Sequence, residues 1–240
     1  MNRKKALVFG GSRGIGASVV RALAEEGFDV AFTYVSSAPA ESPAVAGAKI
    51  APVQCDIRDP AAVAAAFDTA ETSLGGQIDC VVANAGINVP PAPIAQFPHD
   101  RFREVVEVNL IGAFNVLHEA AGRVADGGTI IGLTTSMVRL AIPGVGPYSA
   151  TKAAVECLLR SMSKELAPRH VRVNGVAPGP VDTDLFRAGK DQAALDRSAG
   201  MSPFNRVGRT EEVAAVVRFL ASEKASWVHG QIIQPNGGMA

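Results

Sequence analysis

The sequence predicts an α/β fold in which about seven parallel strands form one doubly wound sheet with helices on both faces. Short apolar, β-branched runs alternate with longer Ala-rich segments of helical spacing, as expected of repeated strand–helix–strand units. Apolar residues make up 48% of the chain and aromatic residues only 5%, so Ala, Val, Leu and Ile should build a core suited to strands buried on both faces. A chain of 240 residues in this class commonly forms one domain, and we expect residues 1–240 to do so.

The expected strands are short apolar runs, each long enough to cross a sheet once. They cover residues 5–9, 30–34, 49–53, 78–83, 129–135, 171–176 and 231–234. Helical patterns fill most of the intervals between them: up to Gly27, over 60–72, from near Asp100, from Tyr148 to Pro168, and over 211–222.

The sequence predicts three further details of the helices and of the connections between them. In the helix that begins near Asp100, one apolar stripe is formed by Phe102, Val106, Leu110, Ala113 and Leu117. Thr210 is expected to cap the last helix, because a hydroxyl there can accept a bond from an unpaired amide. Between the second and third strands, Pro39 and Pro43 argue against a helix.

The first strand leads directly into a glycine-rich turn. Residues 10–16 read Gly-Gly-Ser-Arg-Gly-Ile-Gly, and a helical pattern follows. Strand, glycine turn and helix start form the context of a phosphate-binding turn, because glycine admits a pyrophosphate and the helix start presents unpaired amides. The candidate cofactor residues of this turn are Gly10, Ser12, Arg13, Gly14, Ile15 and Gly16.

The end of the second strand indicates which dinucleotide binds. An acidic residue there would bind the ribose 2′-hydroxyl of NAD, whereas its absence with a cation nearby suits the 2′-phosphate of NADP. The position holds Tyr34, followed by Val35, Ser36 and Ser37, and no carboxylate. We therefore favour NADP(H) over NAD(H), with Arg13 as the cation and Tyr34 and Ser36 beside it; the alternative is that Arg13 is only a solvated turn residue.

A pair of polar residues stands at the start of the helix that follows the fifth expected strand. Tyr148 and Lys152 lie four residues apart, so their side chains share one helix face. A tyrosine phenol has a pKa of about 10, and a neighbouring ammonium favours its ionised form. The pair is a candidate acid or base, and alone it could equally be a solvated face.

With the glycine turn and this pair, three further motifs complete an ordered set. They are Asn84-Ala85-Gly86, Asn109, and Pro178-Gly179 with Val181 and Thr183. On this set the chain resembles, almost end to end, the classical short-chain dehydrogenase/reductase family, whose members have a Rossmann-type fold. One departure is Phe9, because the family usually has Thr before the first motif glycine, and a local hydrogen bond is then missing.

The resemblance implies roles for these residues. Asn84, Ala85 and Gly86 would support the sheet beside the cofactor. Asp56 and Ile57 would touch the adenine ring; the alternative for Asp56 is that it caps a turn. The nicotinamide would be held by Pro178, Gly179, Val181 and Thr183, and residues 184–208 would form a substrate lid.

The resemblance also implies a reaction. The catalytic residues would be Asn109, Ser136, Tyr148 and Lys152, with NADPH reducing a ketone or a 3-oxoacyl thioester and Tyr148 donating the proton. Tyr148 and Lys152 would also bind the cofactor, with Lys152 holding the nicotinamide ribose and lowering the pKa of Tyr148. The family's usual spacing from Tyr148 lands on Thr135, while the nearest serine is Ser136; we favour Ser136 as the hydroxyl that donates to the substrate carbonyl. The alternative function is a dinucleotide-binding sensor or scaffold without turnover.

Partners follow from the resemblance in the same way. In the family, two long helices pack against their copies, so a homo-oligomer is implied, a tetramer or a dimer. An acyl carrier protein is acidic and would need a basic patch. Arg172 stands where carrier-dependent reductases have one contact, but the turn before the fifth strand has one cation, Arg123, and one acid, Asp126. Docking of a carrier protein is therefore less favoured, and a small ketone or a sugar-like alcohol remains open as the substrate.

Charge and composition limit which partners, metals and cellular locations are expected. Lys plus Arg and Asp plus Glu are both 23, so neither nucleic acid nor an anionic membrane surface is an expected partner. Cys55, Cys80 and Cys157 are scattered, and the four histidines form no ligand-spaced cluster, so we expect neither disulfides nor a metal. No apolar run reaches the length of a secretory signal or a membrane span, which favours a soluble cytoplasmic protein.

Overall fold

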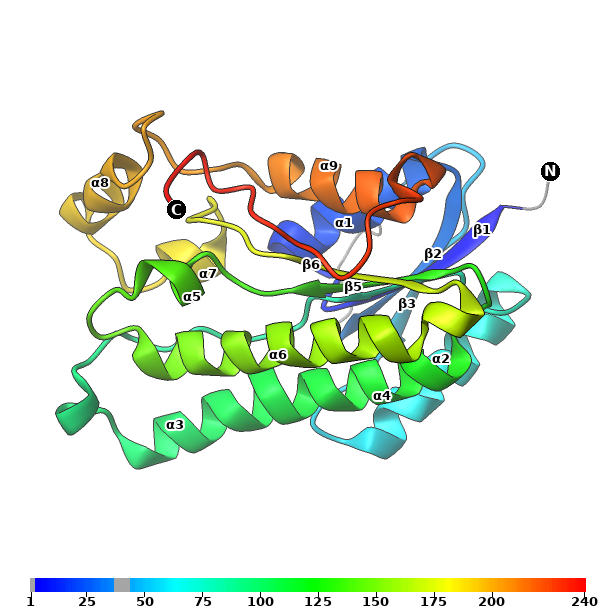
Figure 1. Ribbon diagram of the computed structural model, residues 1–240, viewed down its shortest axis with the longest axis horizontal. Helices are drawn as coiled ribbons and strands as arrows, with labels where there is room; N and C mark the ends of the chain where they lie inside the picture. The colour runs from blue at the N-terminus through cyan, green and yellow to red at the C-terminus, as the bar shows by residue number, and fades with distance from the viewer. Residues whose placement is uncertain (1–2, 37–43) are drawn as a thin grey trace.

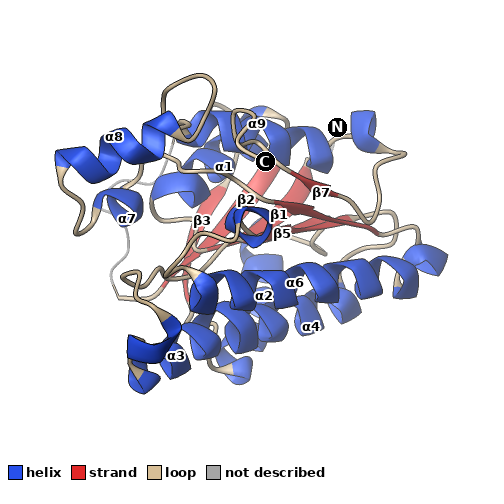
Figure 2. Ribbon diagram, turned by 60° about the vertical axis from the view of Figure 1, so that its left-hand side comes forward, coloured by secondary structure: helices blue, strands red, loops and turns tan. Residues whose placement is uncertain are grey.

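A parallel sheet flanked by helices on both faces forms the centre of the molecule (Figures 1 and 2). The computed structural model describes residues 3–36 and 44–240. Within them the sheet has seven strands in the order β3-β2-β1-β4-β5-β6-β7. The strands are β1 (Lys4–Phe9), β2 (Phe28–Tyr34), β3 (Ile50–Gln54), β4 (Cys80–Ala83), β5 (Thr129–Leu133), β6 (Arg172–Val176) and β7 (Ile232–Ile233). Since the order runs outward from β1 in both directions, the predicted doubly wound topology is confirmed.

The helices divide into two layers. On one face lie α1 (Gly14–Glu25) and α9 (Thr210–Ala221), and on the other α2 (Pro60–Leu74), α4 (Ala113–Arg123) and α6 (Gly146–Glu165) (Figure 2). α3 (His99–Val106) and the π-helical turn η2 (Glu107–Gly112) lead into α4 as one continuous rod. The short elements α5 (Met137–Leu140), α7 (Asp184–Arg187) and α8 (Gln192–Gly200) stand at one end of the molecule, at the carboxyl edge of the sheet (Figure 1).

Each face of the sheet has its own apolar core. Leu7 and Phe9 of β1 pack on one side with Phe67 and Leu117, while Ala6 and Val8 belong to the opposite core. Strand side chains alternate in direction, so an unbroken apolar run supplies both cores at once. The predicted core of small aliphatic residues is thus present on both faces.

Strand and helix boundaries differ from the predicted ones by a few residues. β5 ends at Leu133 rather than at residue 135, and Thr134 and Thr135 continue into the site. The cap predicted for the last helix is wrong by one position. Arg209 is the N-cap residue, Thr210 is the first helical residue, and Glu212 accepts a bond from the Arg209 amide at 2.8 Å.

The predicted apolar stripe of the long helical rod is wrong in its first half. Phe102 is 44% exposed, whereas Val105 and Asn109 are fully buried. The π-helical turn between α3 and α4 explains the difference, because i to i+5 bonding admits one extra residue and rotates the buried face. Periodicity alone carries no sign of such a turn.

The crossover between β2 and β3 has no helix in its described parts, residues 35–36 and 44–49. Pro39, Pro43 and Ser37 lie outside the described residues. Elsewhere in the described ranges, no helix combines the length and the apolar character needed to cross a membrane.

Candidate functional site

The glycine turn closes tightly against its neighbours. Gly10 and Gly14 have φ of 74° and 55°, which favours glycine at both positions. A Cβ on Gly16 would stand 2.0 Å from the Gly10 carbonyl oxygen and 2.7 Å from Asn84 Nδ2. Asn84 Nδ2 itself donates to that oxygen at 2.8 Å, so the first residue of the Asn84-Ala85-Gly86 motif fixes the turn.

The start of α1 is built to receive an anion. Its N-cap residue, Arg13, makes no side-chain cap bond, and the first turn carries no acidic residue. Neither a cap side chain nor a carboxylate therefore competes for the first amides of the helix, which form the positive end of its dipole. The glycines leave room for a phosphate to reach these amides. These residues fit the pyrophosphate of a dinucleotide.

Phe9, the departure from the family pattern, is compensated from the neighbouring strand. Its ring is fully buried, 5.8 Å from that of Phe67. The Gly10 amide donates instead to Thr33 Oγ1 at 2.9 Å. The sequence analysis missed Thr33, because only the pairing of β1 with β2 brings its hydroxyl to the turn.

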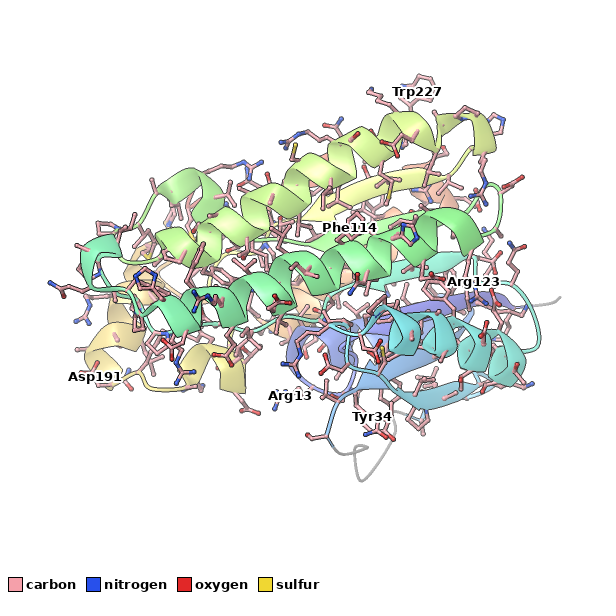
Figure 3. All side chains as sticks on the ribbon, turned by 90° about the horizontal axis from the view of Figure 1, so that it is seen from below. Arg13, Tyr34, Phe114, Arg123, Asp191 and Trp227 are labelled. Carbon is pink, nitrogen blue, oxygen red and sulfur yellow. The ribbon has the colours of Figure 1, made fainter. Side chains whose placement is uncertain are left out.

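The residues predicted to select the dinucleotide lie at the ends of β2 and of the glycine turn. Gly11 N donates to Thr33 O at 3.1 Å, which ties the turn to the end of β2. Arg13 is exposed, and it lies on the same side of the molecule as Tyr34 (Figure 3). Tyr34 is half-buried and Ser36 is exposed. This edge therefore offers a guanidinium and hydroxyl groups but no carboxylate at the end of β2.

Asp56 and Ile57 follow β3 but have partners of their own. The Asp56 carboxylate accepts from Arg58 Nε at 3.0 Å and from Arg58 N at 3.0 Å, and the Arg58 side-chain bond holds the pKa of Asp56 below its usual range. Ile57 is buried against Gly112. Of the two roles considered for Asp56, the turn contact is present, and contact with adenine stays a prediction.

Asn109 and Lys152 converge beside Gly86. Asn109 Oδ1 accepts from Ile87 N and its Nδ2 donates to Ile87 O, both at 2.8 Å. A Cβ on Gly86 would lie 3.0 Å from Asn109 Oδ1 and 3.4 Å from Lys152 Nζ. Asn109 therefore satisfies its amide on the strand-end loop, and it holds that loop next to Lys152.

Burial shifts the pKa values of both Tyr148 and Lys152 on α6. Burial raises the pKa of Tyr148 to about 12, and a hydrogen bond from Thr135 acts in the opposite direction. Burial lowers the pKa of Lys152 to about 8, and its Nζ donates to Leu133 O at 3.0 Å. The pKa of Tyr148 thus moves upward, opposite to the predicted lowering, because desolvation of the phenol outweighs the contribution of Thr135.

The two candidate hydroxyls have different partners. Ser136 is fully buried; its Oγ donates to Ala177 O at 2.7 Å and accepts from Asn236 Nδ2 at 3.1 Å. Thr135 Oγ1 instead accepts from Met137 N at 3.3 Å, and Thr135 lies close enough to Tyr148 to lower the pKa of its phenol. The structure therefore brings Thr135 to Tyr148, and it commits the Ser136 proton to a backbone carbonyl.

The segment predicted to hold the nicotinamide lies against the glycine turn. Thr183 caps α7 by accepting from Phe186 N at 3.1 Å, and a Cβ on Gly14 would lie 3.3 Å from Thr183 Cγ2. Gly179 N donates to Pro235 O at 3.3 Å, which places the chain after β7 over this segment. The carbonyl oxygen of Pro178 accepts a hydrogen bond from Ser136 N at 2.9 Å. Asn236, at the junction, was missed because nothing local marks it as a site residue.

The cations considered for carrier-protein docking are engaged elsewhere. Arg172 is half-buried and donates to Leu220 O at 2.6 Å and to Ala225 O at 3.2 Å, carbonyls around the end of α9. Arg123 pairs with Asp68 and Glu71 at 2.6 and 2.5 Å. Over residues 3–36 and 44–240, no group of three or more His, Cys, Asp or Glu is placed to hold a metal ion.

Known sequences resemble this chain over its whole length. The family model described as enoyl-(acyl carrier protein) reductase matches residues 10–240. A short-chain type dehydrogenase/reductase of Picea abies is 40% identical over 97% of this chain and 91% of its own. An NADPH-dependent aldehyde reductase-like protein of Arabidopsis thaliana is 39% identical (97% and 93%). The 3-oxoacyl-[acyl-carrier-protein] reductase MabA of Mycobacterium bovis is 36% identical (98% and 92%).

Solved structures agree with the sequence matches. A short-chain dehydrogenase/reductase from Serratia marcescens superposes with a TM-score of 0.90 at 35% identity, over 98% of this chain and 97% of that one. A short-chain dehydrogenase from Burkholderia cenocepacia in complex with NADP does so with a TM-score of 0.90 at 32% identity, over the same shares of the two chains. The fold, the ordered motifs and these similarities show that the chain belongs to the classical short-chain dehydrogenase/reductase family.

Proposed function

We propose that the protein reduces a carbonyl compound to a secondary alcohol with NADPH. The observation that carries the proposal is the convergence of Thr135 and Tyr148, close enough for Thr135 to lower the pKa of the Tyr148 phenol, one helical turn from buried Lys152. Two hydroxyls that meet at one point can polarise a carbonyl oxygen and deliver a proton to it. The open amides of α1 lie at the same carboxyl edge of the sheet.

The proposed cofactor is NADP(H). When bound, it supplies the hydride that the carbonyl carbon receives. The first amides of α1 would hold its pyrophosphate, and Arg13 with Ser36 would receive a 2′-phosphate, which needs a cation and donors rather than a carboxylate. The printed names of the Arabidopsis relative and of the Burkholderia complex support this choice, since each refers to NADPH or NADP.

Thr135, rather than Ser136, is the hydroxyl that we propose to face the substrate. Ser136 donates to Ala177 O and is fully buried, so its proton is not free for a carbonyl. Thr135 Oγ1 accepts from Met137 N at 3.3 Å, which leaves its own proton free for a substrate carbonyl, and Tyr148 beside it would donate to the substrate oxygen. The high pKa of Tyr148 keeps its proton at neutral pH, as a proton donor requires. Lys152 would stabilise the phenolate that forms and, with Asn109 beside it, restore the proton from solvent.

The substrate proposed is a small ketone. Docking of a carrier protein through Arg172 is not favoured, because its guanidinium is held by carbonyls around the end of α9. A 3-oxoacyl thioester remains the second candidate on the strength of the Mycobacterium relative alone. Residues 184–208, which form α7 and α8 at the carboxyl edge, are the proposed substrate lid.

The test follows oxidation of NADPH and NADH against ketones, aldehydes, quinones and 3-oxoacyl thioesters. We expect turnover with NADPH, its loss in Tyr148→Phe, and a larger fall in kcat for Thr135→Val than for Ser136→Ala. Retained turnover in Tyr148→Phe would contradict the proton assignment. Tight NADPH binding without oxidation by any carbonyl would favour the sensor or scaffold instead.

We also propose a homo-oligomer that is built in part on the face of α4 and α6, in a cytoplasmic setting. Ile111 and Phe114 are 40% and 49% exposed on this face, and Figure 3 shows Phe114 directed away from the sheet. Two large apolar side chains on adjacent turns favour burial against a copy of the same surface. Cys55, Cys80 and Cys157 are all free, which suits a reducing compartment.

A further inference from the structure

A buried carboxylate lies one turn beyond Lys152 on α6. Glu156 is 2% exposed, and the Arg139 guanidinium of α5 donates to its two oxygens at 2.9 and 3.0 Å. Such a two-point contact fixes the direction as well as the distance of both side chains. None of the motifs that identify the family includes either residue of this pair.

The same carboxylate also holds the end of β5. Thr134 Oγ1 donates to Glu156 Oε1 at 3.1 Å, and Thr134 immediately precedes Thr135. Glu156 therefore binds residues on both sides of Thr135: Thr134 before it and Arg139 after it. Tyr148, the partner of Thr135, stands on the same helix as Glu156.

The segment between these two anchors has little stability of its own. α5 spans four residues, which is too short to persist without outside contacts. It ends at Ala141, whose φ of 50° lies in the left-handed region that a residue with a Cβ rarely adopts. Contacts with α6 must therefore supply the stability that this short helix and the residue after it lack.

We propose that Glu156 is a positioning residue that fixes the Thr135 hydroxyl on Tyr148 by holding Thr134 and Arg139 to α6. The inference rests on the proposed reduction, in which Thr135 faces the substrate. Glu156 would act on catalysis through Thr135, and not through the phosphate-binding turn, which lies at the start of α1.

Arg160 provides a matched control. Its guanidinium also approaches Glu156, at 3.6 Å, but from the following turn of α6, and its side chain is 53% exposed. Removing Arg160 takes a positive charge from the same carboxylate without touching α5. Any effect of charge balance alone would therefore appear in Arg160→Met as well as in Arg139→Met.

The experiment measures kcat, KM and NADPH affinity for Glu156→Gln in the wild-type and Thr135→Val backgrounds. We expect kcat to fall about tenfold or more in the wild-type background and to change by less than about twofold when Thr135 is already absent. The Kd for NADPH should stay within about twofold throughout. Arg139→Met should reproduce the fall and Arg160→Met should not.

Equal falls of kcat in both backgrounds, or a fall in Arg160→Met, would overturn the inference, because either result means general loss of structure. If Glu156→Gln does not fold, Arg139→Met in the two backgrounds gives the same comparison with a half-exposed side chain. Tyr148→Phe separates the two proposals. Activity retained in that variant refutes the proposed mechanism, whereas its loss together with an unaffected Glu156→Gln refutes only the positioning role.

Discussion

Gly16 occupies a site that leaves no volume for a side chain. A Cβ there would stand 2.0 Å from the Gly10 carbonyl oxygen. We expect Gly16→Ala to lower the free energy of unfolding by about 3 kcal/mol, because backbone must shift to admit the methyl group, and to abolish NADPH binding. Denaturant unfolding and cofactor titration measure the two effects.

The matched control for this substitution is Gly122 in α4. Nothing lies within 4 Å of a Cβ on Gly122. Gly122→Ala should therefore leave stability unchanged or raise it by up to about 1 kcal/mol, as alanine does in helices. Equal losses of stability in both variants would contradict the packing argument.

Lys152 makes stability depend on pH in a predictable direction. Its pKa falls from 10.5 to about 8 on folding, so between these values the unfolded chain binds more protons than the native one. Stability from this group therefore rises with pH over that window. Relative to Lys152→Met, the wild type should gain up to about 3 kcal/mol between pH 8 and 10.5.

The measurement is the difference in free energy of unfolding between the two proteins at several pH values. The comparison is needed because burial raises the pKa values of Cys80 and Tyr148 to about 12. Those groups lower stability at the upper end of the window in both proteins, so their effect cancels. A difference that stays constant from pH 7 to 10 would show that Lys152 is not desolvated.

At single positions, the sequence predicted residue types better than it predicted their partners. The motif glycines and Asn84 meet in the glycine turn as expected, because their neighbours are local or paired strands. The choice of Ser136 over Thr135 depended on which side chain turns toward α6. That direction is set by Ala177 and Asn236, distant residues that local sequence cannot place.

Among the elements, the π-helical turn η2 has the most direct link to the site. It places Asn109 fully inside, where its amide makes both hydrogen bonds to Ile87. Asn109→Ala would leave the Ile87 amide and carbonyl without these partners. We expect a loss of about 2 kcal/mol in the free energy of unfolding, together with a fall in kcat.

Asn115 in α4 is the comparison for that variant. It donates to Ile57 O at 2.9 Å from a half-buried position and lies away from Lys152. Asn115→Ala should cost about 1 kcal/mol and leave kcat unchanged. A fall in kcat of the same size in both variants would show that the effect of Asn109 comes from helix stability alone.

Long elements were predictable because their apolar spacing repeats many times, and all seven strands were found. The boundaries of these elements were harder to predict, because the end of β5 and the N-cap of α9 depend on single contacts. The π-helical turn was invisible to periodicity, which assumes 3.6 residues per turn throughout. The error in the predicted stripe begins at Phe102 and is gone by Ala113, beyond the turn.

At the scale of the molecule, the face of α4 and α6 should mediate assembly. Phe114→Glu would put a charge where the proposed interface excludes water, so we expect a smaller species by light scattering. Arg21→Glu, on α1 at the opposite face of the sheet, is the control and should keep the size of the wild type. A wild type that is already monomeric would refute the proposed oligomer.

The contact between Asn236 and Ser136 joins positions 100 residues apart, and it has a consequence for how the chain is made. Synthesis runs from the N-terminus, so β1, the glycine turn and Thr33 leave the ribosome early and can form a nucleotide-binding half. The strap of Pro235 and Asn236 over Pro178 and Gly179 arrives much later, together with β7 at the sheet edge. A nascent chain should therefore acquire affinity for the dinucleotide well before it acquires an ordered hydroxyl pair for chemistry.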